Sequence, residues 1–204
     1  MKATRTSRST YPGSTRSRGD VTTFIALLRG INVSGHNKIP MGDLRRLCDG
    51  LGYGNAQTYI QSGNVVLAAT DGAAAIEGKL EHAIELRFGF SVPVIVRTVK
   101  QWARYLAGNP FPSASQQEPN HVLMGLSKSR PAKGAVAELR DRAAAGEQVE
   151  LRQDALWIFY AGGVARSKLT PALLDRVVGS SVTARNWRTV QQLAALARTA
   201  TSVP

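Results

Sequence analysis

A β-hairpin is predicted by residues 57–69, QTYIQSGNVVLAA, and the fold follows from what flanks it. Residues 57–61 and 65–69 have the composition of strands, and Ser62-Gly63-Asn64 between them is typical of a tight turn. A strand at residues 23–28 and a helix that begins near Pro40 are predicted before the hairpin. A helix over residues 73–88 and a strand over residues 92–96 are predicted after it. Pro93 in this last strand favours the edge of a sheet.

The resulting order, βαββαβ, predicts a ferredoxin-like unit, in which an antiparallel sheet carries helices on one face. A second set of elements repeats the order, with strands near residues 121–126, 148–153, 156–161 and 182–185 and helices near 132–145 and 170–178. A last helix is predicted near residues 189–198. Residues 97–103 and 188–194 are identical at five of seven positions, which favours an internal duplication. The predicted fold class is α+β, with tandem ferredoxin-like units.

Four parts follow from this pattern. Residues 1–20 form a basic tail with few apolar residues, which we expect to be disordered or an over-extended start. A basic arm for nucleic acid or an anionic surface is the alternative for this tail. Residues 21–107 form the first unit, residues 108–120 a linker rich in Pro, Ser and Gln, and residues 121–204 the second unit with its C-terminal helix.

Composition limits the function classes. The formal net charge of +12 favours anionic partners, either small molecules or nucleic acid. No apolar run is long enough for a membrane span, so we expect a cytoplasmic protein without a membrane partner. Cys48, the single cysteine, has the helical spacing of a packed core thiol rather than of a nucleophile. The three histidines lie far apart in sequence, and neither a metal site nor a cofactor is predicted.

A candidate binding site follows from the strand order. The loop after the first strand and the turn of the hairpin should meet at one end of the first sheet, beside the N-terminus of the first helix. Glycines there allow close backbone approach, amides and a hydroxyl offer hydrogen bonds, and two cations suit an anion. The alternative is that these residues only form turns. The predicted ligand-binding residues are Arg29, Gly30, Asn32, Asn37, Lys38, Gln61, Ser62 and Asn64.

Four sequence blocks resemble the bacterial domain of unknown function 1697 family over roughly residues 21–198. The blocks are residues 27–33 (LLRGINV), 37–41 (NKIPM), 58–65 (TYIQSGNV) and 183–187 (TARNW). The resemblance implies an α+β fold of ferredoxin-like character and no established activity. Members of the family usually have glycine at the position of Ser34 and lysine or arginine at that of His36, so the family pattern is broken in this loop.

A second basic cluster is predicted at one end of the second sheet, with residues Arg166, Lys168, Arg185, Asn186 and Trp187. Trp187 could stack on a base between arginines, or anchor the last helix in the core. The catalytic residues are not identifiable, because no known catalytic motif occurs and Asp43 in the first helical turn suits the helix dipole without a catalytic duty. We therefore predict a non-catalytic module that binds a nucleotide, a phosphorylated metabolite or nucleic acid. A small transferase or hydrolase of a phosphorylated metabolite is the alternative.

Overall fold

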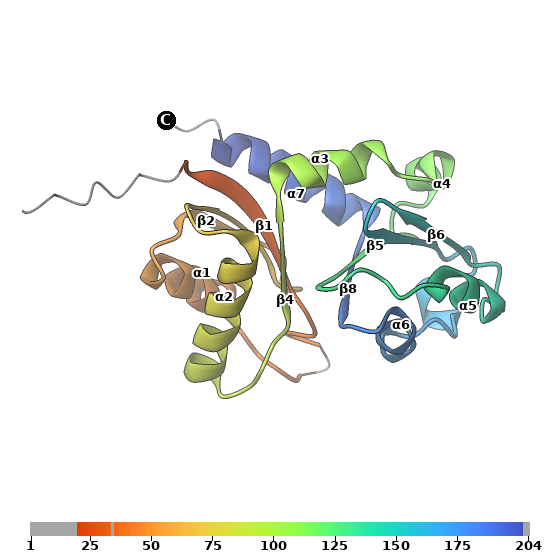
Figure 1. Ribbon diagram of the computed structural model, residues 1–204, viewed down its shortest axis with the longest axis horizontal. Coiled ribbons are helices and arrows are strands. Elements are labelled where there is room, and N and C mark those ends of the chain that lie inside the picture. Colours follow the sequence, from red (N-terminus) through yellow and green to blue (C-terminus); the bar gives the residue numbers. More distant parts are fainter. Residues whose placement is uncertain (1–19, 34, 202–204) are drawn as a thin grey trace, which may run out of the picture.

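A computed structural model of the chain describes residues 20–33 and 35–201 (Figure 1). The predicted basic tail, apart from Asp20, lies outside the described residues. The first part of the chain contains four strands and two helices in the predicted order βαββαβ. They are β1 (Thr22–Leu28), α1 (Met41–Gly50), β2 (Gly54–Tyr59), β3 (Asn64–Ala69), α2 (Ala73–Phe88) and β4 (Val94–Thr98).

The same order returns in the second part. Two helices come between the sheets: α3 (Val99–Ala107) and α4 (Pro112–Gln117), the latter inside the segment predicted as a linker. Then come β5 (Val122–Ser127), α5 (Ala135–Asp141), β6 (Gln148–Arg152), β7 (Ala155–Phe159), the 3-10 helix η1 (Val164–Arg166), α6 (Pro171–Val178), β8 (Val182–Asn186) and α7 (Trp187–Thr201). Within residues 20–33 and 35–201, no helix has both the length and the apolar character needed to cross a membrane.

Each sheet has four antiparallel strands in the ferredoxin-like arrangement, with orders β2-β3-β1-β4 and β6-β7-β5-β8. The fold is therefore α+β with two such sheets, as the sequence predicted. Strand β4, which follows Pro93, is an edge strand as expected. The end of β1 lies beside the turn between β2 and β3, because Leu27 pairs with Asn64 and the Leu28 amide donates to the Gly63 carbonyl at 2.8 Å.

Alternate side chains of β1 point to opposite faces of the first sheet and so belong to two separate hydrophobic cores. Phe24, Ala26 and Leu28 pack with α1 and α2 on one face of the first sheet. Ile25 and Leu27 point to the opposite face, where they meet the second sheet and helices α3 and α7. Figure 1 shows α3 and α7 side by side across both sheets.

This shared interior is called the central core below. The Trp102 indole N–H in α3 donates to the Val190 carbonyl of α7 at 3.0 Å, so its polar atom is satisfied. Because both sheets contribute one face to it, the two units bury apolar surface against each other. The central core includes Ile25, Leu27, Val66, Ile95, Trp102, Tyr105, Val122, Met124, Leu126, Trp157, Val190, Leu193 and Ala197.

Sheet register relates the two units differently from the sequence match. Arg97 on β4 pairs with Ile25, and Arg185 on β8 pairs with Met124; Ile25 and Met124 hold the same place in their strands. Arg97 is therefore equivalent to Arg185 rather than to Arg188. The match between residues 97–103 and 188–194 is out of structural register by three residues. Repeated topology, rather than that match, supports the duplication.

The hairpin is longer than the tight turn that was predicted. Strand β2 ends at Tyr59, and residues 60–63 form the loop, with Ile60 at φ 47° and Gly63 at φ 76°. A Cβ atom on Gly63 would lie 2.7 Å from both the Leu28 Cβ and the Ile31 Cδ1 atoms. Glycine is therefore needed here for both its backbone conformation and its lack of a side chain. The predicted strand at 57–61 is shifted in the structure, because the chain leaves the sheet at Ile60.

Candidate functional site

The two segments of the predicted site meet as the strand order implies. The Asn32 side chain in the loop after β1 donates to the Gln61 carbonyl in the β2–β3 loop at 2.8 Å. The same amide group also donates to the Ile39 carbonyl at 3.0 Å and accepts from the Ile39 amide at 2.9 Å. The Asn32 side chain therefore makes three hydrogen bonds to the backbone of Ile39 and Gln61, so its amide group is engaged within the chain.

Asn37 and Asn64 are also engaged. Asn37, at φ 48°, donates to the Gly30 carbonyl at 3.1 Å, which closes the loop after β1. Asn64 is fully buried; its amide nitrogen donates to the Tyr59 carbonyl at 2.9 Å and to the Ser62 hydroxyl at 3.0 Å. These contacts hold the loop after β1 and the β2–β3 loop in shape. Ligand binding by these amides remains a prediction.

The two predicted cations differ in their surroundings. The Arg29 guanidinium pairs with Asp175 of α6 at 2.7 Å and donates to the Val182 carbonyl, so it joins the first unit to the second. Lys38 is exposed and forms no ion pair with any described residue. It borders a depression of about 380 Å³ together with Asn32 and Gln61. The structure thus leaves Lys38, rather than Arg29, available to an anion in this loop.

The second predicted cluster is divided between several places. Trp187 packs at the central core, with its ring 5.8 Å from that of Trp157. The Asn186 side chain accepts from the Thr189 amide at 2.9 Å and so caps α7. Lys168 borders a depression beside α5, and Arg166 ends η1. Arg185 alone points into the contact between the two units.

Arg185 fixes the β2–β3 loop from the opposite unit. Its guanidinium donates to the Asn64 side-chain oxygen at 2.5 Å and to the carbonyls of Leu28 and Ser62, both at 2.8 Å, with Gly63 at 3.2 Å. Burial lowers the pKa of Arg185 to about 10, which still leaves the side chain charged at neutral pH. No described carboxylate forms an ion pair with it, so its positive charge is balanced only by dipoles.

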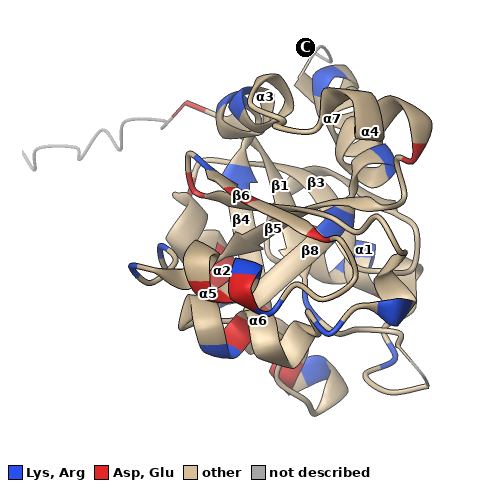
Figure 2. Ribbon diagram, turned by 90° about the vertical axis from the view of Figure 1, so that its right-hand side faces the viewer, with Lys and Arg blue, Asp and Glu red and all other residues tan. Residues whose placement is uncertain are grey.

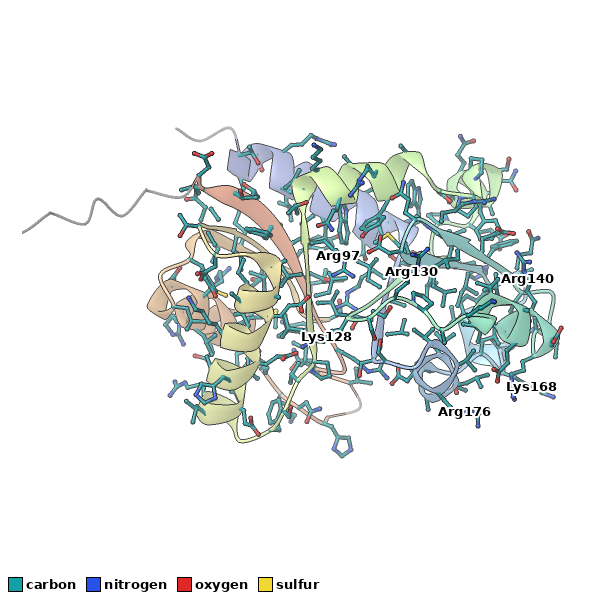
Figure 3. All side chains as sticks on the ribbon, in the orientation of Figure 1. Arg97, Lys128, Arg130, Arg140, Lys168 and Arg176 are labelled. Atoms are coloured by element: carbon teal, nitrogen blue, oxygen red, sulfur yellow. The ribbon has the colours of Figure 1, made fainter. Side chains whose placement is uncertain are left out.

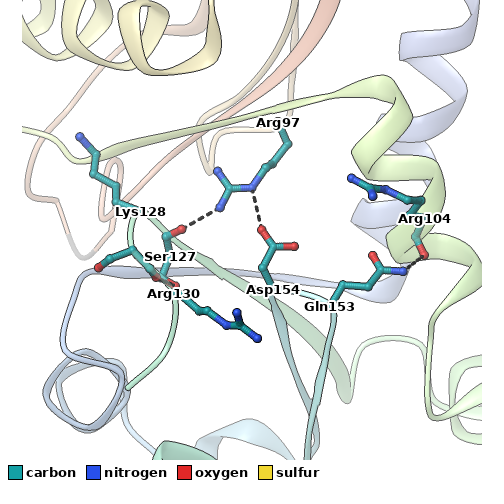
Figure 4. A pocket seen from close by; sticks show the side chains of 8 residues that line it. Arg97, Arg104, Ser127, Lys128, Arg130, Gln153 and Asp154 are labelled. Carbon is teal, nitrogen blue, oxygen red and sulfur yellow. Dashed lines mark hydrogen bonds and ion pairs between the residues drawn. The ribbon is translucent and has the colours of Figure 1, made fainter. Parts of the chain in front are cut away.

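A basic pocket, which the sequence reasoning missed, lies at the equivalent contact around Arg97 (Figures 3 and 4). Its volume is about 300 Å³. Four cations and one carboxylate line it, from β4, α3, the segment after β5 and the β6–β7 turn. The lining residues are Arg97, Arg104, Ser127, Lys128, Ser129, Arg130, Gln153 and Asp154.

Arg97 and Asp154 form the fixed wall of the basic pocket. Arg97 donates to the Ser127 carbonyl at 2.7 Å and to the Tyr105 hydroxyl at 3.2 Å, and its Nε lies 3.5 Å from Asp154 Oδ2. The Tyr105 hydroxyl donates to Asp154 at 2.7 Å. Burial, helped by this hydrogen bond, raises the pKa of Tyr105 to about 12, so the phenol stays protonated.

Two arginines of the basic pocket are available to a ligand. Lys128 pairs with Glu81 of α2 at 2.5 Å, but Arg104 and Arg130 are exposed and form no ion pair with the described part of the chain. In Figure 4, Arg130 extends toward the space beneath Asp154. The sequence contained a signal for this pocket, because the basic segment Lys128-Ser129-Arg130 directly follows the first strand of the second unit, just as Arg29-Gly30 directly follows β1. The described residues contain no group of three or more His, Cys, Asp or Glu that could hold a metal ion.

Comparisons with known proteins agree with this fold. The model of a family described as protein of unknown function (DUF1697) matches residues 21–157. A solved structure described as a conserved bacterial protein from Streptococcus pneumoniae matches with a TM-score of 0.71 and 20% sequence identity. The match covers 87% of this chain and 99% of that one, and at this identity it concerns the fold alone. No curated protein matches the chain.

Proposed function

We propose that this chain, which belongs to the DUF1697 family of proteins of unknown function, is a non-catalytic module that binds a small anion with phosphoryl groups. The observation that carries the proposal is the basic pocket, where four cations surround about 300 Å³ with Asp154 as the lone lining carboxylate. This volume is at the lower end for ligand pockets. A nucleotide or a phosphorylated metabolite is the ligand class that such a pocket suits.

The arginines of the basic pocket differ in how firmly they are held, and this difference supports anion binding. Arg97 is held in place by hydrogen bonds to Tyr105, Val96 and Ser127 and by the nearby carboxylates of Asp154 and Glu77. Arg104 and Arg130, by contrast, can close on a phosphate from the open side of the basic pocket. Planar guanidinium groups match the geometry of phosphate oxygens. Catalysis is outside the proposal, because Asp154 is engaged by both Tyr105 and Arg97. Lys38, in the depression of the first unit, is proposed as a weaker anion contact.

The distribution of charge favours a small anion over nucleic acid. Figure 2 shows Lys and Arg on many elements of this side of the molecule, with Asp and Glu among them. An extended nucleic-acid surface needs a continuous series of cations along its phosphates. We propose the cytoplasm as the place of action; the buried free thiol of Cys48 is compatible with a reducing compartment.

The test is a titration of the ¹⁵N-labelled protein, in HEPES buffer, with inorganic phosphate, pyrophosphate and AMP, followed by calorimetry of the tightest of them. We expect the amide signals of residues 127–130 and 153–154 to shift. Arg104→Ala or Arg130→Ala should each weaken binding by about 1.5–3 kcal/mol, the range for a hydrogen bond to a charged group. Arg45→Ala is the matched control, since Arg45 is exposed on α1 away from the basic pocket.

Two results would contradict the proposal. One is the absence of shifts around the basic pocket at millimolar concentrations of all three anions. The other is equal weakening by Arg45→Ala and Arg130→Ala, which would indicate attraction by the net charge alone. Tight binding of a DNA or RNA duplex, insensitive to Arg130→Ala and lost steeply with salt, would favour the nucleic-acid alternative instead.

A further inference from the structure

Only polar residues line the basic pocket. Every lining residue carries a charged, amide or hydroxyl side chain, and no aliphatic or aromatic residue is among them. Sites for nucleobases and for other flat or apolar groups present aromatic or aliphatic surface, on which those groups stack or pack. The volume of about 300 Å³ is also small for a ligand pocket. The part of a ligand that lies beside the phosphate in this pocket is therefore small and hydrophilic.

One oxygen of the Asp154 carboxylate is free to accept from such a ligand. Asp154 Oδ1 accepts from the Tyr105 hydroxyl at 2.7 Å. The other oxygen, Oδ2, lies 3.5 Å from Arg97 Nε, which is longer than a normal hydrogen bond, and it accepts no hydrogen bond from any described residue. The side chain is 41% exposed, and Figure 4 shows its carboxyl group among the cations of the pocket. Because a carboxylate repels a bound phosphate, its place here is favourable only where the ligand also offers hydrogen-bond donors.

Gln153 places a second acceptor next to Asp154. The two residues form the turn between β6 and β7, because Arg152 pairs with Ala155 across it. The Gln153 side-chain nitrogen donates to the Arg104 carbonyl at 3.2 Å, and its side-chain oxygen accepts from no residue in the described part of the chain. Two acceptors on one short turn suit neighbouring hydroxyl groups, each of which donates one hydrogen bond.

Hydroxyl groups fit these acceptors better than an ammonium group does. Arg97 already balances the charge of Asp154, and three further cations line the pocket, so another positive charge would be repelled. A neutral hydroxyl avoids this repulsion and still donates a hydrogen bond. The exposed side chains of Arg104 and Arg130 remain for the phosphate.

We propose that the ligand of the basic pocket is a sugar phosphate, whose phosphate binds Arg104 and Arg130 and whose neighbouring hydroxyl groups donate to Asp154 and Gln153. This inference rests on the proposed function, since it requires the phosphate to bind in the basic pocket. The arginines then supply the affinity for the phosphate. Asp154 and Gln153 select the group that carries it.

The test compares ribose 5-phosphate with tetrahydrofurfuryl phosphate, which has the same ring and the same phosphate but lacks the ring hydroxyl groups. Dissociation constants are measured by calorimetry in HEPES buffer, with inorganic phosphate as the reference. We expect ribose 5-phosphate to bind about tenfold more tightly than tetrahydrofurfuryl phosphate, because the second compound loses a hydrogen bond to a charged acceptor and leaves that acceptor unpaired.

Variants of the turn identify the acceptors. Asp154→Asn keeps the size of the side chain and an acceptor for the Tyr105 hydroxyl, but it removes the charge and the free acceptor. We expect it to reduce the preference for ribose 5-phosphate about fivefold, while inorganic phosphate binds as tightly as before or more tightly, since a negative charge has left the pocket. Gln153→Ala, at an exposed turn position, should reduce the preference about threefold.

The matched control is Asp141→Asn, which removes the same charge from the same unit. Asp141 is exposed at the end of α5 and does not line the basic pocket, so the preference for ribose 5-phosphate should stay unchanged. The thermal midpoint of each variant shows whether it is folded.

The proposal is overturned if the parent protein binds the two esters equally, or if a folded Asp154→Asn variant keeps the full preference. If Asp154→Asn does not fold, Gln153→Ala decides, and an unchanged preference in that variant overturns the proposal. Equal binding of the two esters and of inorganic phosphate removes this inference alone and leaves the proposed function standing. Absence of binding by all three overturns both.

Discussion

Replacement of Arg185 by alanine should strongly destabilise the protein. The side chain comes from β8, yet four of its acceptors belong to the first unit: the Asn64 amide oxygen and the carbonyls of Leu28, Ser62 and Gly63. Removal leaves these acceptors without their donor in the interior of the contact between the units.

The magnitude can be worked from these contacts. A hydrogen bond to a charged group contributes about 1.5–3 kcal/mol, so four of them have a gross value of roughly 6–12 kcal/mol. Burial of the guanidinium opposes this by several kcal/mol, and that term is recovered when the charge is removed. We therefore expect a net loss of about 3–5 kcal/mol in the free energy of unfolding. This is a large fraction of the stability of an ordinary domain, about 5–15 kcal/mol.

Urea unfolding followed by tryptophan fluorescence is the suitable assay, because Trp102 and Trp157 lie in the central core and report its exposure. Arg188→Ala is the matched control: Arg188 is exposed three residues further on, and its loss should change stability by no more than about 0.5 kcal/mol. In a double-mutant cycle, Arg185→Ala and Asn64→Ala should couple by about 0.5–3 kcal/mol. A loss below about 1 kcal/mol for Arg185→Ala would refute this account of the contact.

Three further predictions concern Gly63, Cys48 and Tyr105. Gly63→Ala should destabilise the protein by about 1–3 kcal/mol in the same urea assay, because its Cβ would meet Leu28 and Ile31; an unchanged midpoint would contradict this. Burial raises the pKa of the Cys48 thiol to about 12 from an ordinary 9.0, so a thiol reagent at pH 8 should react only after unfolding. Because Cys48 and Tyr105 keep protons in the folded state that the unfolded chain releases, the free energy of unfolding should fall as pH rises from about 9 towards 12, and a flat profile would exclude this linkage.

The periodicity of apolar residues predicted helices and strands well where the residues within the element determine its bounds. Helix α2 has the predicted bounds of residues 73–88, since its apolar stripe of Ile76, Leu80 and Ile84 defines a helix face. Helix α6 (Pro171–Val178) lies within the predicted residues 170–178, because Thr170 caps its start, Pro171 suits its first position and a left-handed Gly179 ends it. Helix α5 is shorter than predicted, at Ala135–Asp141, because Gly134 before it has a φ of 86° that no helix residue adopts.

The candidate site was less predictable, because its chemistry depends on how the two units pack. Strand order alone brought the loop after β1 to the β2–β3 loop, and that juxtaposition is correct. No local pattern could show that Arg29 and Arg185 would cross into the opposite unit and be engaged there. The basic pocket was missed for the same reason: Arg97 and Arg130 are distant in sequence and meet only through the packing of β4 against the second unit.

The duplicated scaffold explains why the basic pocket occurs on one side only. Arg185 donates to the carbonyl of the last residue of β1, and Arg97 to that of the last residue of β5. Likewise, Arg29 directly after β1 pairs with Asp175 of α6, and Lys128 directly after β5 pairs with Glu81 of α2. These reciprocal contacts hold the units together, and in each unit they come from equivalent positions, one on the last strand and one directly after the first strand.

The units differ two residues further along each loop. After β1 this position is Ile31, which is buried and lies over Gly63; after β5 it is Arg130, which is exposed and stands near Asp154, the counterpart of Gly63 in the sheet register. An apolar side chain over a glycine closes the contact in one case. At the other contact, the Arg130 guanidinium near the Asp154 carboxylate leaves an open, polar and positively charged space. The charge that suits an anion therefore arises where the second unit has Arg130 in place of the apolar Ile31 of the first unit.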